Sequence, residues 1–233
     1  MSAALTVKSE FSRETQFVRQ APPVWLVREQ AAPRRAELAH HLPPMSFAQD
    51  SGIFAEGDAA RYFYKVVGGV VRSCRFSQDG RRHIDAFYKV GEMFGFELGA
   101  VHELSAEAVT DCVVIPLRRQ GVELAGAQDE TSAMQLYTYA MQSLTRARAH
   151  SQLLGRCSAV QKLASFLLEL SADKQGQAIE LPMTRQDIGD YLGLTIETVS
   201  RTLSQLEKDG AITLQAARRI SIKSRAALAD LKG

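Results

Sequence analysis

The chain has 233 residues, enough for two modest domains that each bury a hydrophobic core. Hydrophobic residues make up 45% and charged residues 23%, as in soluble globular proteins, and a net charge of +2 is too small to identify a nucleic-acid-binding protein. Residues 1–20 lack an apolar signal segment and no apolar run of about 18 residues occurs, so we expect a cytoplasmic protein without a membrane span.

The first half of the chain predicts a leader followed by a β-barrel. Residues 1–41 show no sustained hydrophobic period, so we expect a largely irregular leader with a short helix at most around residues 34–40. Over residues 42–128, short β-rich runs alternate with glycine turns, which predicts a small antiparallel β-barrel or jelly roll. The expected strands are residues 62–67, 69–76, 83–88 and 108–117, with turns at residues 56–58, 68–69 and 78–80.

A long amphipathic helix is expected over residues 129–157. Its apolar residues follow the a and d spacing of a helical seam, and they are Met134, Tyr137, Met141 and Leu144. Only part of the apolar surface of such a helix can cover the barrel, so we expect this stripe to form a symmetric homodimer. The alternative, in which the stripe packs wholly on its own barrel, stays open.

Residues 158–233 predict a winged helix-turn-helix domain. An amphipathic helix over residues 158–170 forms its base, and a polar connector follows at residues 172–180. Thr184 and Asp187 have the spacing of a capping box, which begins a helix at about Arg185. Gly193 ends this helix because glycine adopts a positive φ without strain, and Thr195 caps a second helix. Two alternating strands at residues 211–214 and 219–222, joined by residues 215–218, form the wing.

The second helix has an apolar and a polar face. Val199, Leu203 and Leu206 form the inward stripe, and Gly189 of the first helix lies where the two helices would cross closely. The opposite face carries Glu197, Ser200, Arg201 and Ser204, side chains of the kind that read base edges in the major groove. An ordinary αα-hairpin with a solvated face is the alternative, and the wing favours DNA binding. The predicted DNA-binding residues are Thr184, Arg185, Thr195, Glu197, Thr198, Ser200, Arg201 and Ser204.

A barrel, a long helix and a winged helix in this order resemble the cyclic AMP receptor protein and fumarate-nitrate reduction regulator superfamily of bacterial transcription factors. The resemblance covers about residues 45–233, and its most specific parts are MTRQDIGDYLGLTIETVSRTL and the segment Leu163-Ala164-Ser165-Phe166. It implies an α+β fold with a cyclic-nucleotide-binding-like barrel, a dimerisation helix and a C-terminal winged helix-turn-helix.

The fumarate-nitrate reduction regulator branch of this superfamily reads DNA with a Glu-x-x-Ser-Arg pattern. In this chain the pattern falls on Glu197, Ser200 and Arg201. The implied target is double-stranded DNA with a palindrome similar to TTGAT-N4-ATCAA. Arg201 can bond guanine O6 and N7, Glu197 can accept from the cytosine N4 amine, and Ser200 can approach a thymine or adenine edge. Each good pair contributes about 1–3 kcal/mol of discrimination.

The cysteines of this chain differ from those with which related oxygen sensors bind an iron–sulfur cluster. Cluster-binding relatives use N-terminal cysteines, whereas residues 1–73 contain none, and Cys112 is displaced by one residue relative to Pro116, which turns a strand side chain to the other face. We therefore expect no iron–sulfur cluster, and we predict that Cys74, Cys112 and Cys157 are buried small hydrophobes.

The chain also resembles a cyclic-nucleotide-binding cassette, from Gly91-Glu92 through Glu97 to Ser105-Ala106. However, Leu104 occupies the position of the arginine that pairs with the cyclic phosphate, so we expect no bound nucleotide. The scattered histidines form no spaced metal set, although haem is harder to exclude. A ligand-gated sensor with a small molecule or haem in the barrel stays the alternative.

Without these ligands the chain resembles the FixK-like subgroup, whose members are controlled largely through their own synthesis, often below an oxygen-responsive two-component system. The hairpin tip Asp79-Gly80-Arg81 aligns with a family loop that touches RNA polymerase, and we expect exposed charges there at Asp79, Arg81 and Arg82. A plain solvated turn explains the same residues equally well. We find no pairing of nucleophile and base and no phosphate-cradling loop, so we do not expect an enzyme.

Overall fold

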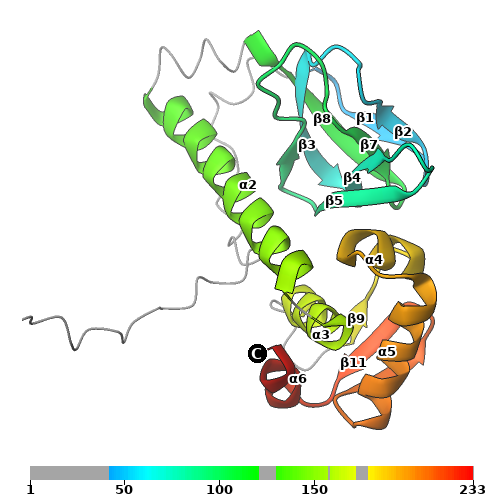
Figure 1. Ribbon diagram of the computed structural model, residues 1–233. Helices are drawn as coiled ribbons and strands as arrows, with labels where there is room; N and C mark the ends of the chain where they lie inside the picture. Colours follow the sequence, from blue (N-terminus) through cyan, green and yellow to red (C-terminus); the bar gives the residue numbers. More distant parts are fainter. Residues whose placement is uncertain (1–41, 121–129, 157, 172–177, 233) are drawn as a thin grey trace, which may run out of the picture.

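The computed structural model describes residues 42–120, 130–156, 158–171 and 178–232. The expected leader at residues 1–41, with its short helix, lies outside the described residues, as does Cys157. Within these ranges the chain forms a β-barrel, a long helix and a C-terminal domain in which helices surround a small sheet (Figure 1). No described helix is both long enough and apolar enough to cross a membrane.

Two antiparallel sheets form the barrel, which confirms the predicted α+β fold with an N-terminal barrel or jelly roll. The strand order is β1-β8-β3-β6 in one four-stranded sheet and β2-β7-β4-β5 in the other. The strands are β1 (Met45–Phe47), β2 (Gly52–Phe54), β3 (Tyr62–Gly68), β4 (Val71–Phe76), β5 (Arg82–Tyr88), β6 (Met93–Phe94), β7 (Ser105–Ala108) and β8 (Cys112–Arg118).

The strand predicted at residues 108–117 is confirmed from Cys112 onward as β8, but it starts too early, because Ala108 is the last residue of β7, a strand of the other sheet that was not predicted. β7 ends at Ala108 and pairs with β4, whereas β8 begins at Cys112 and pairs with β3. The two polar residues between them, Thr110 and Asp111, are too few to mark a clear break in an apolar run, so the sequence did not separate the two strands. β1, β2 and β6 were not predicted, since strands of two or three residues are too short to show a period.

Gly69 makes the tight turn between β3 and β4 possible. Its φ is +75°, and a Cβ atom at this position would lie 2.2 Å from the carbonyl oxygen of Asp111. A larger residue would therefore be strained and would also collide with the backbone. The predicted turn at residues 68–69 is confirmed, and the predicted strand after it begins at Val71 rather than at Gly69.

Helix α2 (Glu130–Arg156) confirms the predicted long helix and leads from the barrel to the C-terminal domain (Figure 1). One side of it packs on the barrel, where the rings of Tyr139 and Phe96 lie 6.3 Å apart and Arg146 forms a 2.6 Å ion pair with Glu92. The predicted stripe does not pack on the described barrel. Its exposed fractions are 58% for Met134, 61% for Tyr137, 39% for Met141 and 42% for Leu144.

The C-terminal domain contains the predicted winged helix-turn-helix. Its elements are α3 (Ala159–Leu170), β9 (Ile179–Glu180), α4 (Arg185–Leu192), α5 (Ile196–Lys208), β10 (Ile212–Ala216), β11 (Arg219–Ile222) and α6 (Arg225–Lys232). The polar connector predicted at residues 172–180 is wrong at its end, because Ile179 is buried and β9 pairs with β11 as a third strand of the wing sheet. The wing loop is also shorter than predicted, since β10 continues through Ala216.

The barrel and the C-terminal domain share one hydrophobic core. Ile84 and Phe87 of β5 belong to the same buried cluster as Ile188 and Tyr191 of α4, and the rings of Phe87 and Tyr191 lie 5.3 Å apart. Figure 1 shows α4 directly below β5. The helix-turn-helix is therefore held against the barrel by packing as well as by the chain connection.

Candidate nucleic-acid interface

Helix α4 begins with the predicted capping box. The Thr184 hydroxyl accepts a hydrogen bond from the backbone N–H of Asp187 at 3.1 Å, and the Asp187 carboxylate accepts one from the backbone N–H of Thr184 at 2.9 Å. Both bonds satisfy amide donors that the first turn of a helix leaves without partners. Arg185, the first helical residue, is thereby fixed at the start of α4.

The turn between α4 and α5 depends on two glycines. Gly193 ends α4 with a φ of +63°, as predicted. The carbonyl oxygen of Gly189 accepts a hydrogen bond from the backbone N–H of Leu194 at 2.9 Å, and a Cβ atom on Gly189 would lie 2.6 Å from the carbonyl oxygen of Leu194. The close approach predicted at Gly189 is confirmed, but its partner is the turn rather than the next helix.

Helix α5 presents its apolar face to the core. Thr195 caps it by accepting a hydrogen bond from the backbone N–H of Thr198 at 3.2 Å, and the predicted stripe of Val199, Leu203 and Leu206 is buried. The fixed inward face leaves the opposite face to solvent: Glu197, Arg201 and Ser204 are exposed and Ser200 is half-buried. The polar residues predicted to read DNA are therefore accessible on one element.

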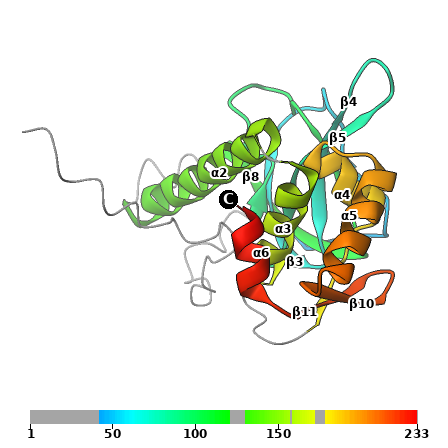
Figure 2. The same ribbon diagram turned by 60° about the horizontal axis from the view of Figure 1, so that its bottom comes forward.

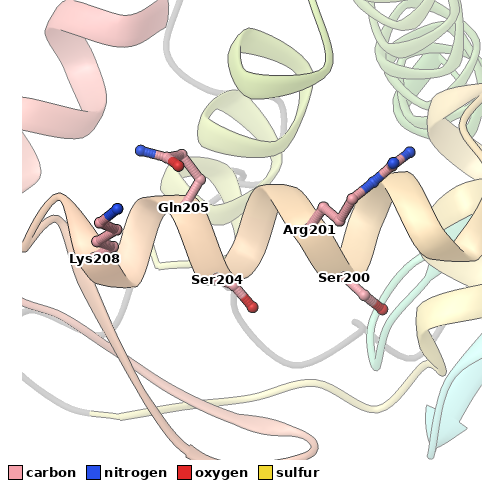
Figure 3. A pocket seen from close by; sticks show the side chains of 5 residues that line it. All are labelled: Ser200, Arg201, Ser204, Gln205 and Lys208. Atoms are coloured by element: carbon pink, nitrogen blue, oxygen red, sulfur yellow. The ribbon is translucent and has the colours of Figure 1, made fainter.

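A shallow open groove of about 500 Å³ runs along α5 and is lined by Ser200, Arg201, Ser204, Gln205 and Lys208. Figure 3 shows Arg201, Gln205 and Lys208 projecting from one edge of the helix and the two serines from the other. The sequence prediction did not include Gln205 and Lys208. Gln205 lies four residues after Arg201 and Lys208 four residues after Ser204, so both belong to the same helix face as predicted residues.

Glu197 and Arg201 carry opposite charges on successive turns of α5. The pKa of Glu197 is lowered by a hydrogen bond from its own backbone N–H, by the Thr195 hydroxyl and by the charge of Arg201. Its carboxylate is therefore ionised and accepts hydrogen bonds only. The Arg201 guanidinium lies 3.5 Å from the Thr198 hydroxyl and offers donors only.

A contact between the two helices joins two of the predicted residues. The guanidinium Nη1 of Arg185 on α4 donates a hydrogen bond of 3.2 Å to the hydroxyl of Ser200 on α5. The sequence predicted both residues as DNA contacts but gave no sign that they touch. Of the predicted set, Thr184 and Arg185 begin α4, Thr195 caps α5, and the other five lie on α5 itself.

The predicted polymerase-facing tip lies at the turn between β4 and β5, which projects from the barrel (Figure 2). Arg81 is 87% exposed and forms a 3.2 Å ion pair with Asp79, whose pKa is lowered first by a hydrogen bond from Ser77. The prediction that Arg82 is exposed is wrong, because it forms ion pairs with Asp187 and with Asp190 of α4, the second at 2.8 Å.

The cassette residues do not fit a cyclic nucleotide. Leu104 is a half-buried apolar side chain at the position that would need a cation for the phosphate. Glu97 lies with Oε1 3.6 Å from Nδ1 of His102 and accepts a hydrogen bond from the backbone N–H of Glu103 at 3.2 Å. Leu104 therefore supplies no charge for a buried phosphate, whereas Glu97 could still face a ribose.

The described cysteines do not fit an iron–sulfur cluster. Cys74 and Cys112 are buried, as predicted, and they lie on strands of different sheets. Burial raises the pKa of the Cys74 thiol to about 11 and also raises that of Cys112. Both thiols are therefore protonated near neutral pH, whereas metal ligation requires the thiolate. Within the described ranges, no group of three or more His, Cys, Asp or Glu side chains is placed to hold a metal ion.

Comparison with known proteins matches both halves of the chain to families. Residues 44–128 match the cyclic nucleotide-binding domain, and residues 161–231 match the Crp-like helix-turn-helix domain. The nitrogen fixation regulation protein FixK of Azorhizobium caulinodans is 41% identical over 210 residues, which cover 87% of this chain and 84% of that protein. FixK of Rhizobium meliloti is 39% identical over 212 residues, covering 87% and 97%. The solved structure of FixK2 from Bradyrhizobium japonicum has a TM-score of 0.78 and 42% identity, and the match covers 82% of this chain and 96% of that one.

Proposed function

The chain belongs to the FixK-like subgroup of the cyclic AMP receptor protein and fumarate-nitrate reduction regulator superfamily and is a DNA-binding transcription regulator, and from this premise we propose that it is a homodimeric activator. It binds a palindrome similar to TTGAT-N4-ATCAA and recruits RNA polymerase without a bound ligand. Its relatives are named for the regulation of nitrogen fixation, and we propose target genes of the same class.

One observation carries this proposal: the first two turns of α5 expose an ionised carboxylate and a guanidinium on the side away from the core. Glu197 offers only acceptors, which suits the N4 amine of cytosine, and Arg201 offers a planar fork of donors, which suits O6 and N7 of guanine. Arg201 can thus recognise the guanine and Glu197 the cytosine, either within one G·C pair or in two neighbouring base pairs.

The start of α4 supports a second kind of contact. The backbone amides of a helix N-terminus attract phosphate groups, and Thr184 and Arg185 lie at this end of α4. Contacts of this kind fix the position of a protein on DNA, whereas the base contacts of α5 supply the sequence preference.

The exposed stripe of α2 supports a homodimer. A helix side that carries two methionines, a tyrosine and a leucine in solvent gains apolar burial when a second copy of the same helix covers it. A symmetric dimer would present two α5 helices to two half-sites, and this matches a palindromic target.

The tip of the β4–β5 hairpin supports a contact with RNA polymerase. Asp79 and Arg81 are exposed, belong to the projecting turn and lie far along the chain from the predicted DNA-binding residues. A polymerase contact there would leave α5 free for DNA.

A ligand-gated regulator is the second candidate, and one observation favours it. The ring nitrogen Nδ1 of His102 is buried, its contact with Oε1 of Glu97 is 3.6 Å and thus long for a hydrogen bond, and the ring stacks on Phe54 with 3.7 Å between the ring centroids. A bound molecule with a hydrogen-bonding group beside this nitrogen would give it a shorter partner than Glu97. An absorption spectrum and a native mass of the purified protein separate the two candidates, since a Soret band or added mass contradicts the ligand-free form.

Selection of bound sequences from random DNA tests the main proposal. We expect the selected sequences to contain two inverted half-sites one helical turn apart, with guanine and cytosine at the positions read by Arg201 and Glu197. Selection of a single half-site, or of no sequence at all, would count against the homodimer or against base reading respectively.

A further inference from the structure

The hydrogen bond between Arg185 and Ser200 determines which of the two side chains is the donor. Arginine carries five N–H donors and no acceptor, so in this 3.2 Å contact the Ser200 oxygen must accept. The hydroxyl hydrogen cannot point at the guanidinium. It is directed into the part of space that Arg185 leaves open.

Ser200 makes no other hydrogen bond within the part of the chain that the structure describes. This differs from the hydroxyls of Thr138 and Thr145 in α2, which donate to the carbonyl oxygens four residues earlier at 2.7 Å. Ser200 is half-buried and borders the open groove along α5. Its hydroxyl hydrogen is thus available to a molecule that occupies the groove.

We propose that Arg185 is a positioning residue that holds Ser200 as a hydrogen-bond donor toward DNA, so that Ser200 reads an acceptor on a base edge. This inference rests on the proposed function, because it assumes that α5 enters the major groove. The acceptors that the major groove offers are thymine O4, purine N7 and guanine O6. Each of these acceptors is an oxygen or nitrogen atom that has a lone pair and carries no hydrogen.

The same serine without Arg185 would be far less selective. A free hydroxyl rotates, so it can accept from the amine of adenine or cytosine as well as donate to a thymine or guanine oxygen. It can also turn inward and donate to the carbonyl four residues earlier on its own helix, as α2 shows for two threonines. Arg185 occupies one of the two acceptor lone pairs and restricts the rotation of the hydroxyl, which favours donation toward the groove, and the cost of a wrong base then includes an unpaired donor.

A double-mutant cycle combined with base analogues tests the proposal. Affinity is measured for the full-length wild type, Arg185→Ala, Ser200→Ala and the double variant on the selected palindrome. Each thymine in turn is replaced by an analogue without O4, and each purine by its 7-deaza form. In the wild type, one of these deletions within each half-site should weaken binding about 3- to 10-fold, the range of a single net hydrogen bond. The position that responds separates thymine O4 from purine N7.

The deletion should have no effect in Ser200→Ala and a smaller effect in Arg185→Ala than in the wild type, and the double variant should match Ser200→Ala at this base. Arg185→Met, which keeps the length of the side chain without a donor, should behave like Arg185→Ala. Both substitutions leave the capping bonds between Thr184 and Asp187 in place, so helix α4 should persist, as circular dichroism would show. Arg75→Ala removes one positive charge from the barrel, where Arg75 pairs with Glu56 at 3.4 Å, and should leave the base effect at its wild-type size.

Two outcomes of these measurements would overturn the proposed role of Arg185. If Arg185→Ala weakens binding to every DNA by the same factor, and does so equally with and without the Ser200 hydroxyl, Arg185 is a phosphate contact and the proposal is wrong. If Arg201→Ala also leaves sequence preference unchanged, the proposed function itself has failed. A normal response at Arg201 with an uncoupled Arg185 would overturn only the present inference.

Discussion

The guanidinium of Arg72 on barrel strand β4 donates a 3.1 Å hydrogen bond to the carboxylate of Asp187 on α4, the first helix of the helix-turn-helix. Both side chains are almost fully buried, with exposed fractions of 5% and 2% for the two residues. Arg72 also contacts Glu107 at 2.7 Å, and Arg82 forms a second ion pair with Asp187. The carboxylate that caps α4 is therefore also the point at which the barrel holds the DNA-binding domain.

Removing one member of this cluster should destabilise the protein. Arg72→Met removes the more deeply buried of the two cations that Asp187 and Glu107 share and leaves only Arg82 beside them. Loss of one partner of a buried pair costs about 3–5 kcal/mol. We expect the midpoint of thermal unfolding to fall by several degrees, measured by calorimetry. The matched change Arg75→Met, on the same strand but with a half-exposed side chain, should lower the midpoint far less. Equal losses would show that the cluster contributes no more than a surface pair.

Gly189→Ala should damage the helix-turn-helix although alanine favours helices. Its Cβ atom would lie 2.6 Å from the carbonyl oxygen of Leu194, and a backbone atom cannot move aside as a flexible side chain can. We expect a loss of about 1–3 kcal/mol in the free energy of unfolding, together with weaker DNA binding. Gly155→Ala is the control, because a Cβ atom on this α2 residue meets nothing within 4 Å. There the substitution should be neutral or stabilising, and a stabilising Gly189→Ala would contradict the observed turn geometry.

The local signals of the DNA-binding domain could be predicted from the sequence. Thr184 with Asp187, Gly193 and Thr195 act within a few residues of their own position, so spacing alone located both ends of α4 and the start of α5 to within a residue. Strand β7 and the third wing strand, β9, were missed because they depend on pairing partners far along the chain. Arg72 and Asp187 are 115 residues apart, and no periodicity relates them. The Arg185–Ser200 hydrogen bond could not be predicted either, because it depends on the angle between helices α4 and α5.

The α2 stripe should control the oligomeric state. Leu144→Glu places a charge at the C-terminal end of the exposed apolar stripe, and burying it in a dimer seam without a partner is costly. We expect sedimentation to show a dimer for the wild type and a monomer for this variant. Ser143→Glu adds the same charge one residue away, outside the a and d positions, and should remain dimeric. A wild-type monomer at micromolar concentration would refute the predicted seam.

The Cys74 thiol should make stability depend on alkaline pH. Burial raises its pKa from the ordinary value of 9.0 to about 11, so the folded protein retains the proton that the unfolded chain releases. Its contribution is therefore fully present below pH 9 and is lost as the pH rises toward about 11. Denaturant titrations of the wild type and of Cys74→Ala should give a difference in unfolding free energy that is constant below pH 9 and shrinks above it. A difference that stays constant to pH 11 would mean that the thiol titrates normally.

Base-specific reading by α5 is most directly tested by the specificity of Arg201→Ala. The measurement is the ratio of affinities for the selected palindrome and for random DNA of equal length, at one fixed salt concentration, for the wild type, Arg201→Ala and Lys208→Ala. We expect Arg201→Ala to reduce this ratio by about 10-fold or more, because a bidentate bond to guanine is lost from each half-site. Lys208→Ala, from the far end of the same groove, should weaken both affinities alike and leave the ratio unchanged. An unchanged ratio in Arg201→Ala would contradict the account, since Arg201 would then touch only the phosphate backbone.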